Sequence, residues 1–318
     1  MTKRRTLSAG SPRKFDAFTT VTAVVRSALT TCAATALVAT AAIAQTVSPS
    51  PPPAQTPSTG AAPTQDAARQ PAGDRCLALA NRHQPRRRLL HRAGIRYVTL
   101  QSYQARLTFL GHATFLIESP KGVKIATDYA VPIFPPNTPN IATMNIAHSS
   151  HHTYNPQKSI AHVLPGWNDN GGPIIHDVTV QDVRTRNVPT NIRAWGGETR
   201  EFGNSIFIFE IGPLCIAHLG HLHHPLSTQQ LANIGQMDVV LAPVDGSFTL
   251  DTPGLMEVLK AMNPRLIFPM HYFTESTLQR FLSIASQSFT VKRLDTPTFV
   301  ISKDALPLKP EIVVLPGN

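Results

Sequence analysis

The sequence predicts an α+β fold in which two β-sheets pack face to face and helices lie outside them. Short apolar runs separated by turn-forming residues fill the first part of the presumed folded region, and such runs are typical of strands. Strand-like and helix-like stretches then alternate, which places helices against the face of a sheet. In addition, seven of the thirteen histidines fall in two clusters that directly follow apolar runs. We therefore expect a site at the ends of strands.

The first 44 residues are predicted to be a secretory signal peptide. Basic residues between Lys3 and Lys14 precede a mild apolar stretch at 27–42, and the small residues ending at Ala44 suit cleavage. The apolar stretch is short and diluted by threonine, so retention as a membrane anchor is the less favoured alternative. A periplasmic or secreted protein without a stable membrane span after cleavage is expected.

A linker and a single large domain are expected to follow the signal peptide. Residues 45–75 are rich in proline, alanine and serine with almost no large apolar side chain, so they cannot bury enough surface to offset their ordering entropy. This composition predicts a disordered tether. Residues 76–318 are then left for the domain, which is long enough to bury a sizeable core.

The charge of the chain is less extreme than it first looks. The formal net charge is +10, but six basic residues and one acidic residue lie in the first 44 positions, which leaves about +5 for the mature chain. Much of that excess is a run of arginines at 82–96. Because no aromatic residues interleave with them for base stacking, we interpret the run as a solvated segment and expect no nucleic-acid partner.

Two cysteines remain once Cys32 is removed with the signal peptide. In an oxidising compartment Cys76 and Cys215 could pair. Cys215 also sits in a strand-like run, where a small buried thiol is common. The sequence leaves both interpretations open.

The first strands are expected to form an antiparallel meander. They are placed at 106–110, 114–118 and 123–127, joined by short turns that contain glycine. A proline-rich loop at 131–140 then leads to a strand at 141–147 and to the first histidine cluster.

The rest of the chain alternates between strands, loops and helices. A strand at 178–183 and a loop at 187–192 are expected before a long apolar run that ends at the second cluster. Helices are expected from Ser227, where a hydroxyl and a glutamine form a capping box, at 253–262 and at 277–286. Further strands are predicted at 238–244, at 266–269, and near Val291 and Phe299.

Histidines that follow three separate strands predict one metal centre. They occur in the segments AHSSHHTYNP, HLGHLHH and PMH. Histidines that directly follow a strand place their imidazole nitrogens at the edge of a sheet, where zinc and similar ions are usually held.

Six segments resemble the metallo-β-lactamase superfamily, in particular its lactonase-like and phospholipase-D-like hydrolases. They are LGHATFLIES, TDYA, AHSSHHTYNP, HLGHLHH, VVLAPVDG and PRLIFPMHY. The resemblance spans roughly residues 97–300. It implies an αββα sandwich with a metal at one edge of the sheets, where metal-bound water or hydroxide would cleave an ester, lactone, amide or phosphodiester bond of a small molecule. The alternative is a non-catalytic metal-binding member of the same fold.

The sequence departs from the superfamily at its most diagnostic motifs. Where the family has H-x-H-x-D-H, this chain has His148, Ser150, His152 and Thr153, and His151 fits only if the loop is shifted. Where the branch often has H-L-G-D, the last residue is His221. A carboxylate can bridge two ions, whereas a neutral imidazole binds one and adds no negative charge. We therefore expect one Zn²⁺ and not two, with Mn²⁺ or Fe²⁺ as alternatives.

The candidate site residues follow from these motifs. The expected ligands are His148, His151, His218, His221 and His271, with His152 as a further candidate. Single histidines such as His112, His162 and His176 are expected to be structural or on the surface.

Three non-histidine residues complete the candidate site. Asp128 ends the third strand and resembles the aspartate of a T-D-P segment, which orients a ligand imidazole. Asp245 follows a buried strand and is the candidate acidic group near the metal, as ligand, general base or cap. Tyr154 is a candidate for contact with the substrate or an oxyanion, as is Asn191.

Overall fold

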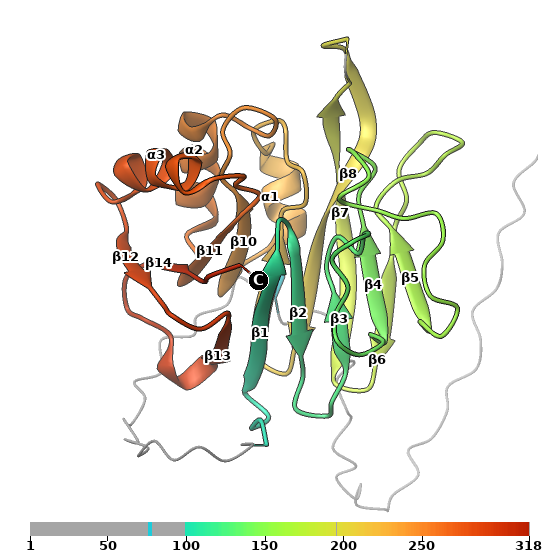
Figure 1. Ribbon diagram of the computed structural model, residues 1–318, viewed down its shortest axis with the longest axis horizontal. Helices are drawn as coiled ribbons and strands as arrows, with labels where there is room; N and C mark the ends of the chain where they lie inside the picture. Colours follow the sequence, from blue (N-terminus) through green and yellow to red (C-terminus); the bar gives the residue numbers. More distant parts are fainter. Residues whose placement is uncertain (1–75, 78–98, 195, 318) are drawn as a thin grey trace, which may run out of the picture. The chain divides into compact units, whose positions relative to one another are not determined.

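The computed structural model describes residues 76–77, 99–194 and 196–317, and within them two β-sheets pack face to face (Figure 1). The predicted α+β sandwich of two mixed sheets is confirmed. The proposed signal peptide and the linker lie outside the described residues. Within those residues, none of the helices is long and apolar enough to cross a membrane.

The first sheet has six strands in the order β13-β1-β2-β3-β4-β5. Strands β1, β2 and β3 form the predicted antiparallel meander, and β3, β4 and β5 run parallel. The strand bounds are β1 Gln104–Gly111, β2 Thr114–Glu118, β3 Lys124–Ala126, β4 Ile141–Met144, β5 His162–Pro165 and β13 Thr298–Ser302.

The second sheet has eight strands in the order β12-β14-β11-β10-β9-β8-β7-β6. Its strands β9, β10 and β11 are parallel neighbours, so their carboxyl ends meet at one edge. The bounds are β6 Asp177–Val180, β7 Val183–Arg193, β8 Thr199–Ile211, β9 Leu214–His218, β10 Val239–Pro243, β11 Leu266–Met270, β12 Thr290–Arg293 and β14 Glu311–Val314.

Strand β8 shows why the apolar runs are continuous and not alternating. Phe207 and Phe209 belong to the core between the sheets, whereas Ile206 and Ile208 belong to the core on the helix side. Successive side chains of a strand point to opposite faces, so a strand covered on both faces must be apolar at every position. Burying each such side chain stabilises the fold by about 1.5–3 kcal/mol.

Three α-helices in the described residues pack against the outer face of the eight-stranded sheet. They are α1 Thr228–Ile234, α2 Thr252–Met262 and α3 Glu275–Ala285, and a short 3₁₀ turn, η1 Lys303–Ala305, follows β13. The side chains of Ser227, Asp251 and Thr274 cap their first turns. The predicted helices are confirmed to within two residues at each described end.

The outer face of the six-stranded sheet is covered by loops. Tyr129, Ile160 and Trp167 pack there with Ala142 of β4. Tyr129 lies in the loop between β3 and β4, which includes the proline-rich segment expected at 131–140. Ile160 lies in the loop between β4 and β5, which also carries the first histidine cluster.

Two predictions for the middle of the chain are wrong. The strand expected at 178–183 is a hairpin, in which β6 ends at Val180 and β7 begins at Val183. The loop expected at 187–192 is the second half of β7. Pro189 is tolerated there because β6 pairs with β7 only as far as Arg186, so its missing N–H lies on an edge of the sheet.

A disulfide joins Cys76 to Cys215, the second residue of β9. Cys76 also accepts a hydrogen bond from the backbone N–H of Gln236, at 2.9 Å. The start of the described chain is therefore fixed beside α1 and the central strands of the second sheet.

Candidate metal centre

The candidate site lies where strands of both sheets end. His148 and His151 follow β4 of the first sheet, and His271 directly follows β11 of the second. His112 occupies the turn between β1 and β2. The site is therefore assembled from both sheets.

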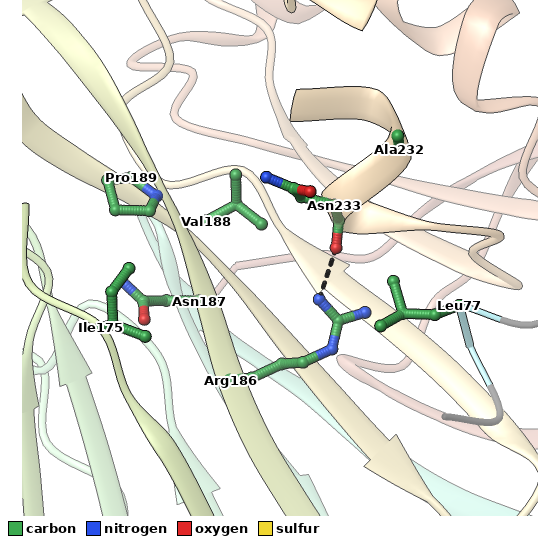
Figure 2. A pocket seen from close by; sticks show the side chains of 8 residues that line it. All are labelled: Leu77, Ile175, Arg186, Asn187, Val188, Pro189, Ala232 and Asn233. Atoms are coloured by element: carbon green, nitrogen blue, oxygen red, sulfur yellow. Dashed lines mark hydrogen bonds between the residues drawn. The ribbon is translucent and has the colours of Figure 1, made fainter. Parts of the chain in front are cut away.

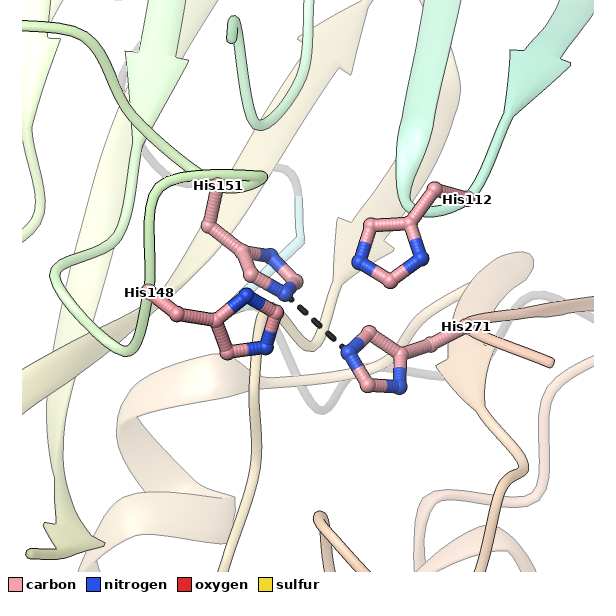
Figure 3. Close-up of side chains that lie close together, drawn as sticks. All are labelled: His112, His148, His151 and His271. Atoms are coloured by element: carbon pink, nitrogen blue, oxygen red, sulfur yellow. Dashed lines mark hydrogen bonds between the residues drawn. The ribbon is translucent and has the colours of Figure 1, made fainter. Parts of the chain in front are cut away.

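Four histidines form a compact cluster (Figure 3). One ring nitrogen from each of His112, His148, His151 and His271 lies within 4.8 Å of the others. His151 and His271 are fully buried, whereas His112 and His148 are partly exposed. The cluster is thus buried on one side and open to solvent on the other.

Asp128 holds His151 from the side of the first sheet. Its Oδ2 lies 2.5 Å from Nδ1 of His151, and its Oδ1 accepts a hydrogen bond from Asn145 at 2.9 Å. Burial raises the pKa of Asp128, although the nearby imidazoles and Asn145 act in the opposite direction. Asn145 also accepts from the backbone N–H of Ser205 on β8, which ties this carboxylate to the second sheet.

Asp245 holds His271 in the same way from the second sheet. Its Oδ2 lies 2.9 Å from Nδ1 of His271. The carboxylate also accepts hydrogen bonds from Ser247, Phe248 and Thr249, and it therefore caps the turn that follows β10. Burial works to raise the pKa of Asp245, but the hydrogen bonds from His271 and Thr249 prevail and lower it. Asp245 is consequently ionised and accepts a hydrogen bond from Nδ1–H of His271.

These two carboxylates turn the imidazoles toward each other. Nε2 of His151 and Nε2 of His271 lie 3.1 Å apart. In each ring Nδ1–H donates to a carboxylate, so Nε2 carries a lone pair. Two lone pairs that face each other at this distance need a proton or a cation between them. Ligating histidines generally donate their other N–H to a carboxylate in this way.

His112 and His148 are linked by a serine hydroxyl. Oγ of Ser150 lies 2.9 Å from Nε2 of His112 and 2.7 Å from Nδ1 of His148. The carbonyl of His112 also accepts from the backbone N–H of His271 at 2.7 Å. The β1–β2 turn is therefore fastened directly to the end of β11.

Three residues of the site adopt left-handed backbone conformations. The φ angles are 49° for His112, 41° for Asp128 and 56° for His271. Positive φ is uncommon for residues other than glycine, and such strain persists only where the surroundings impose it. The chain thus bends sharply at the points where these side chains enter the site.

Three histidines of the site, His112, His148 and His151, are neutral at pH 7. Burial, followed by the neighbouring His271 and His148, lowers the pKa of His112 to about 4. Burial also lowers the pKa values of His148 and His151. A neutral imidazole is the form that binds a metal ion.

His218, an expected ligand, is placed outside the cluster. Its Nε2 donates to the carbonyl of Ala113 at 2.9 Å, and its Nδ1 accepts from the backbone N–H of Gly220 at 3.1 Å. Both ring nitrogens are therefore used by the backbone. The ring fastens β9 to the β1–β2 turn.

The ring of His221 packs against the cluster, with its centroid 4.9, 4.8 and 4.6 Å from those of His148, His151 and His271. Its Nε2 is 3.1 Å from Nε2 of His148, and its Nδ1 is 2.5 Å from Nε2 of His223. It does not belong to the four histidines whose ligand atoms come together. Gly220 allows this placement because a Cβ there would collide with the side chains of Asn204 and Asn145.

His152 and Tyr154 lie beside the cluster and not in it. Nδ1 of His152 donates to the carbonyl of His148 at 3.1 Å, and its ring packs near Trp167. Tyr154 is 68% exposed and its ring lies 5.1 Å from that of His152. Asn191, the other substrate-contact candidate, accepts from the backbone N–H of Phe202 across the β7–β8 hairpin.

His112 is the member of the cluster that sequence reasoning missed. It was expected to be a structural or surface residue because it stands alone in a turn. The signal that could have found it is Gly111-His112, a turn at the end of a buried strand like those that precede the other histidines.

Two exposed aromatic side chains border the cluster. Phe248 and Phe273 are 56% and 54% exposed, and their rings lie 5.6 Å apart. The ring of Phe273 also lies 5.3 Å from His271 and 5.6 Å from His112. An apolar surface therefore adjoins the histidines.

A pocket elsewhere on the molecule contains none of the cluster residues. It is an open pocket of about 460 Å³ between β7 and α1 (Figure 2). Arg186 at its base donates to the carbonyls of Asn233 and Ile234 and to Glu210, so its guanidinium is occupied. The histidine cluster remains the place suited to chemistry.

The chain is similar in sequence to known proteins. The family model described as a beta-lactamase superfamily domain matches residues 106–271, just over half of the chain. A UPF0173 metal-dependent hydrolase of Carboxydothermus hydrogenoformans is 25% identical in an alignment of 201 residues, which covers 53% of this chain and 85% of that protein. A UPF0173 protein of Pyrococcus abyssi is 26% identical, with 53% and 84% covered.

Solved structures of the same superfamily are also similar. A metallo-beta-lactamase superfamily protein from Thermotoga maritima is 27% identical with a TM-score of 0.48, and the match covers 66% of this chain and 98% of that one. Because the matched family model spans β1 to His271, and so includes all four clustered histidines, the chain belongs to the metallo-β-lactamase superfamily.

Proposed function

We propose that the protein is an exported metal-dependent hydrolase that cleaves carboxylic esters or lactones carrying an apolar group. The observation that carries the proposal is the pair His151 and His271, whose Nε2 atoms face each other at 3.1 Å with a carboxylate behind each ring. Metal-dependent hydrolysis is also the activity for which the relative from Carboxydothermus hydrogenoformans is named.

The residues present fit a divalent ion. Tetrahedral zinc with Zn–N bonds of about 2.0–2.1 Å requires its nitrogen ligands to lie roughly 3.3 Å apart. The separation of 3.1 Å between His151 and His271 is close to that value. His112 and His148 supply further neutral nitrogens within the same small volume. One Zn²⁺ is the proposed ion, with Mn²⁺ or Fe²⁺ as alternatives.

The chain's own residues orient and shield the site. When bound, a zinc ion supplies Lewis acidity and lowers the pKa of its bound water to about 7. Asp128 and Asp245 fix the ring orientation of His151 and His271 through Nδ1. Because the oxygens of Asp245 already accept several hydrogen bonds, we assign it this orienting role in preference to that of a general base.

The border of the site favours an apolar substrate over a phosphodiester. Phe248 and Phe273 offer exposed rings beside His271. The nearby guanidinium of Arg193 donates to the carbonyls of Ser247, Phe248 and Thr249 and is therefore occupied. A phosphodiester site normally offers a free cationic fork to the phosphate.

Export is supported by the disulfide between Cys76 and Cys215. Structural disulfides persist in oxidising compartments and are rare in the cytosol. Together with the basic and apolar start of the chain, this supports cleavage after Ala44 and a periplasmic or secreted mature protein.

Metal content and turnover of the mature protein test the proposal. We expect about one zinc per chain by plasma mass spectrometry, and hydrolysis of aryl esters or lactones that a chelator abolishes and added zinc restores. His271→Gln is expected to abolish both zinc binding and hydrolysis. The loop variant His224→Gln is expected to retain both. Zinc binding without turnover of any ester, lactone, amide or phosphodiester would favour the non-catalytic alternative. A mature protein that binds no divalent ion would refute the function.

A further inference from the structure

A chain of hydrogen bonds leads from the end of β7 to the histidine cluster. The backbone N–H of Arg193 donates to Nδ1 of His223 at 3.0 Å, and Nε of the same arginine donates to this nitrogen at 3.2 Å. A backbone N–H and a guanidinium can only donate. Nδ1 of His223 must therefore carry a lone pair, and the ring proton of neutral His223 is on Nε2.

The same logic continues to the next ring. Nε2 of His223 lies 2.5 Å from Nδ1 of His221. Because His223 donates from Nε2, Nδ1 of His221 accepts, and the proton of His221 must be on its own Nε2. That nitrogen is the one that faces the cluster, 3.1 Å from Nε2 of His148.

We propose that His221 is a hydrogen-bond donor directed into the cluster and not a metal ligand, and that Arg193 and His223 are positioning residues that fix this tautomer. A nitrogen that carries a proton has no lone pair for a cation. The use of this N–H rests on the proposed function: when His148 gives its lone pair to a cation, the N–H of His221 is free for an oxygen of an ester or lactone.

The opposite tautomer of His221 would break the two hydrogen bonds from Arg193 to His223, which we call the anchor. If His221 bound a cation through Nε2, its proton would move to Nδ1, and His223 would have to accept at Nε2. The proton of His223 would then sit on Nδ1 and oppose both N–H groups of Arg193. Two hydrogen bonds would be lost at a largely buried ring.

Further hydrogen bonds fix the side chain of Arg193 and the loop that carries His221. Nη2 of Arg193 donates to the carbonyl of Thr249 at 2.7 Å, in the turn that Asp245 caps. The backbone N–H of His221 donates to Oδ1 of Asn204 at 2.8 Å, which fixes the position of its ring. The loop that carries His221 and His223 is thus tied to β7, β8 and the turn after β10.

Nitrogen NMR of the histidine rings tests the tautomer directly. Protein labelled with ¹⁵N-histidine is measured without metal and with one equivalent of Zn²⁺, with His221→Gln and His223→Gln used for assignment. We expect His221 to be protonated at Nε2 in both states. Protonation at Nδ1, or loss of the Nε2 proton when zinc is added, would overturn the proposal. The metal-free measurement decides the tautomer even if zinc binding, and with it the proposed function, fails.

Zinc affinity separates a ligand from a donor. His221→Gln is expected to stay within about threefold of the wild-type zinc affinity, as is the neighbouring control His224→Gln. His271→Gln is expected to lose 100-fold or more. An equal loss in His221→Gln and His271→Gln would show that His221 is a ligand.

Two substitutions of His223 test the anchor. His223→Phe removes both ring nitrogens and is expected to let the proton of His221 redistribute between Nδ1 and Nε2. His223→Gln keeps an acceptor for Arg193 and a donor for His221, so it is expected to restore the Nε2–H form. An unchanged tautomer of His221 in His223→Phe would show that Arg193 and His223 do not set it.

Discussion

At the scale of single residues, the two carboxylates behind the histidines carry the clearest consequence. Asp245 accepts from Nδ1 of His271 and caps the following turn. Groups that orient a ligand histidine typically change metal affinity by about 10–100-fold when they are replaced.

Asp245→Asn is therefore expected to weaken zinc binding by about 10–100-fold, because an amide cannot serve as an ionised acceptor for His271. Competition with a chromogenic chelator measures the affinity. Asp251→Asn is the matched control, since Asp251 caps α2 with no contact to the cluster. Unchanged zinc affinity in Asp245→Asn would contradict the assigned role.

The lowered pKa values of the histidines predict how the metal-free protein responds to acid. His112 and His223 have pKa values of about 4 in the fold, against about 6.5 in an unfolded chain. Between these values the unfolded chain binds more protons, so stability falls as the pH falls from 6.5 toward 4. The raised pKa of Asp128 would make stability rise as the pH falls, but the lowered pKa values of several histidines outweigh the effect of this single group.

Melting temperatures of chelator-treated protein between pH 7.5 and 4.5 check this expectation. A steady decline below pH 6.5 is expected, with a smaller slope in His112→Gln. A melting temperature that does not change down to pH 5 would contradict the burial of neutral histidines.

At the scale of secondary-structure elements, the disulfide ties the segment at Cys76 to β9. The two cysteines are 139 positions apart, and in the chain-entropy model closing a loop of this length is worth up to about 5 kcal/mol. Because β9 leads to His218 and the second histidine cluster, this tie supports the strand that positions that loop.

Cys76→Ala is expected to lower the free energy of unfolding by a few kcal/mol, with about 5 kcal/mol as the upper bound. Denaturant unfolding of the metal-free protein measures it. A thiol-free phosphine reductant should destabilise the wild type to a similar extent and leave Cys76→Ala unaffected. Equal stability of reduced and oxidised wild type would show that the bond contributes nothing.

Elements with strong local signals could be predicted from the sequence, and those set by distant pairing could not. The meander, the capping box at Ser227 and the proline at the start of α2 are local features, and each prediction is confirmed. Pro189 and Asn187 look like loop residues in isolation. They lie in β7 because β8 pairs with them across a long hairpin, which no short window of sequence reveals.

The residues of the candidate site were likewise only partly predictable from the sequence. Clustering of histidines at strand ends indicated the metal centre, and His148, His151 and His271 do come together. Sequence spacing could not tell that both nitrogens of His218 are used by backbone groups from Ala113 and Gly220. Nor could it bring in His112, whose place depends on the β1–β2 turn meeting the end of β11.

At the scale of the whole molecule, the proposed organisation is a cleaved signal at 1–44, a linker at 45–75 and the hydrolase domain at 76–318. The linker composition cannot build a core. The domain, by contrast, has its own core between the sheets and a second core under the helices.

Deleting residues 45–73 from the mature chain is expected to change the melting temperature by less than about 2 °C, because these residues have too few apolar side chains to pack. Differential scanning calorimetry of the two forms measures it. N-terminal sequencing of exported protein should begin at or near Gln45. A large fall in melting temperature would show that the linker docks on the domain, and an intact chain in the cytosol would contradict export.

The facing pair His151 and His271 has one more consequence. The two residues are 120 positions apart and come from different sheets. An ion held between them would act as a second cross-link, closing a loop that overlaps the one closed by Cys76 and Cys215. Unfolding would then have to wait for the ion to leave. If the protein is exported as proposed, and unfolded molecules are lost irreversibly, its working lifetime would be set by the rate of that departure and not by its equilibrium stability.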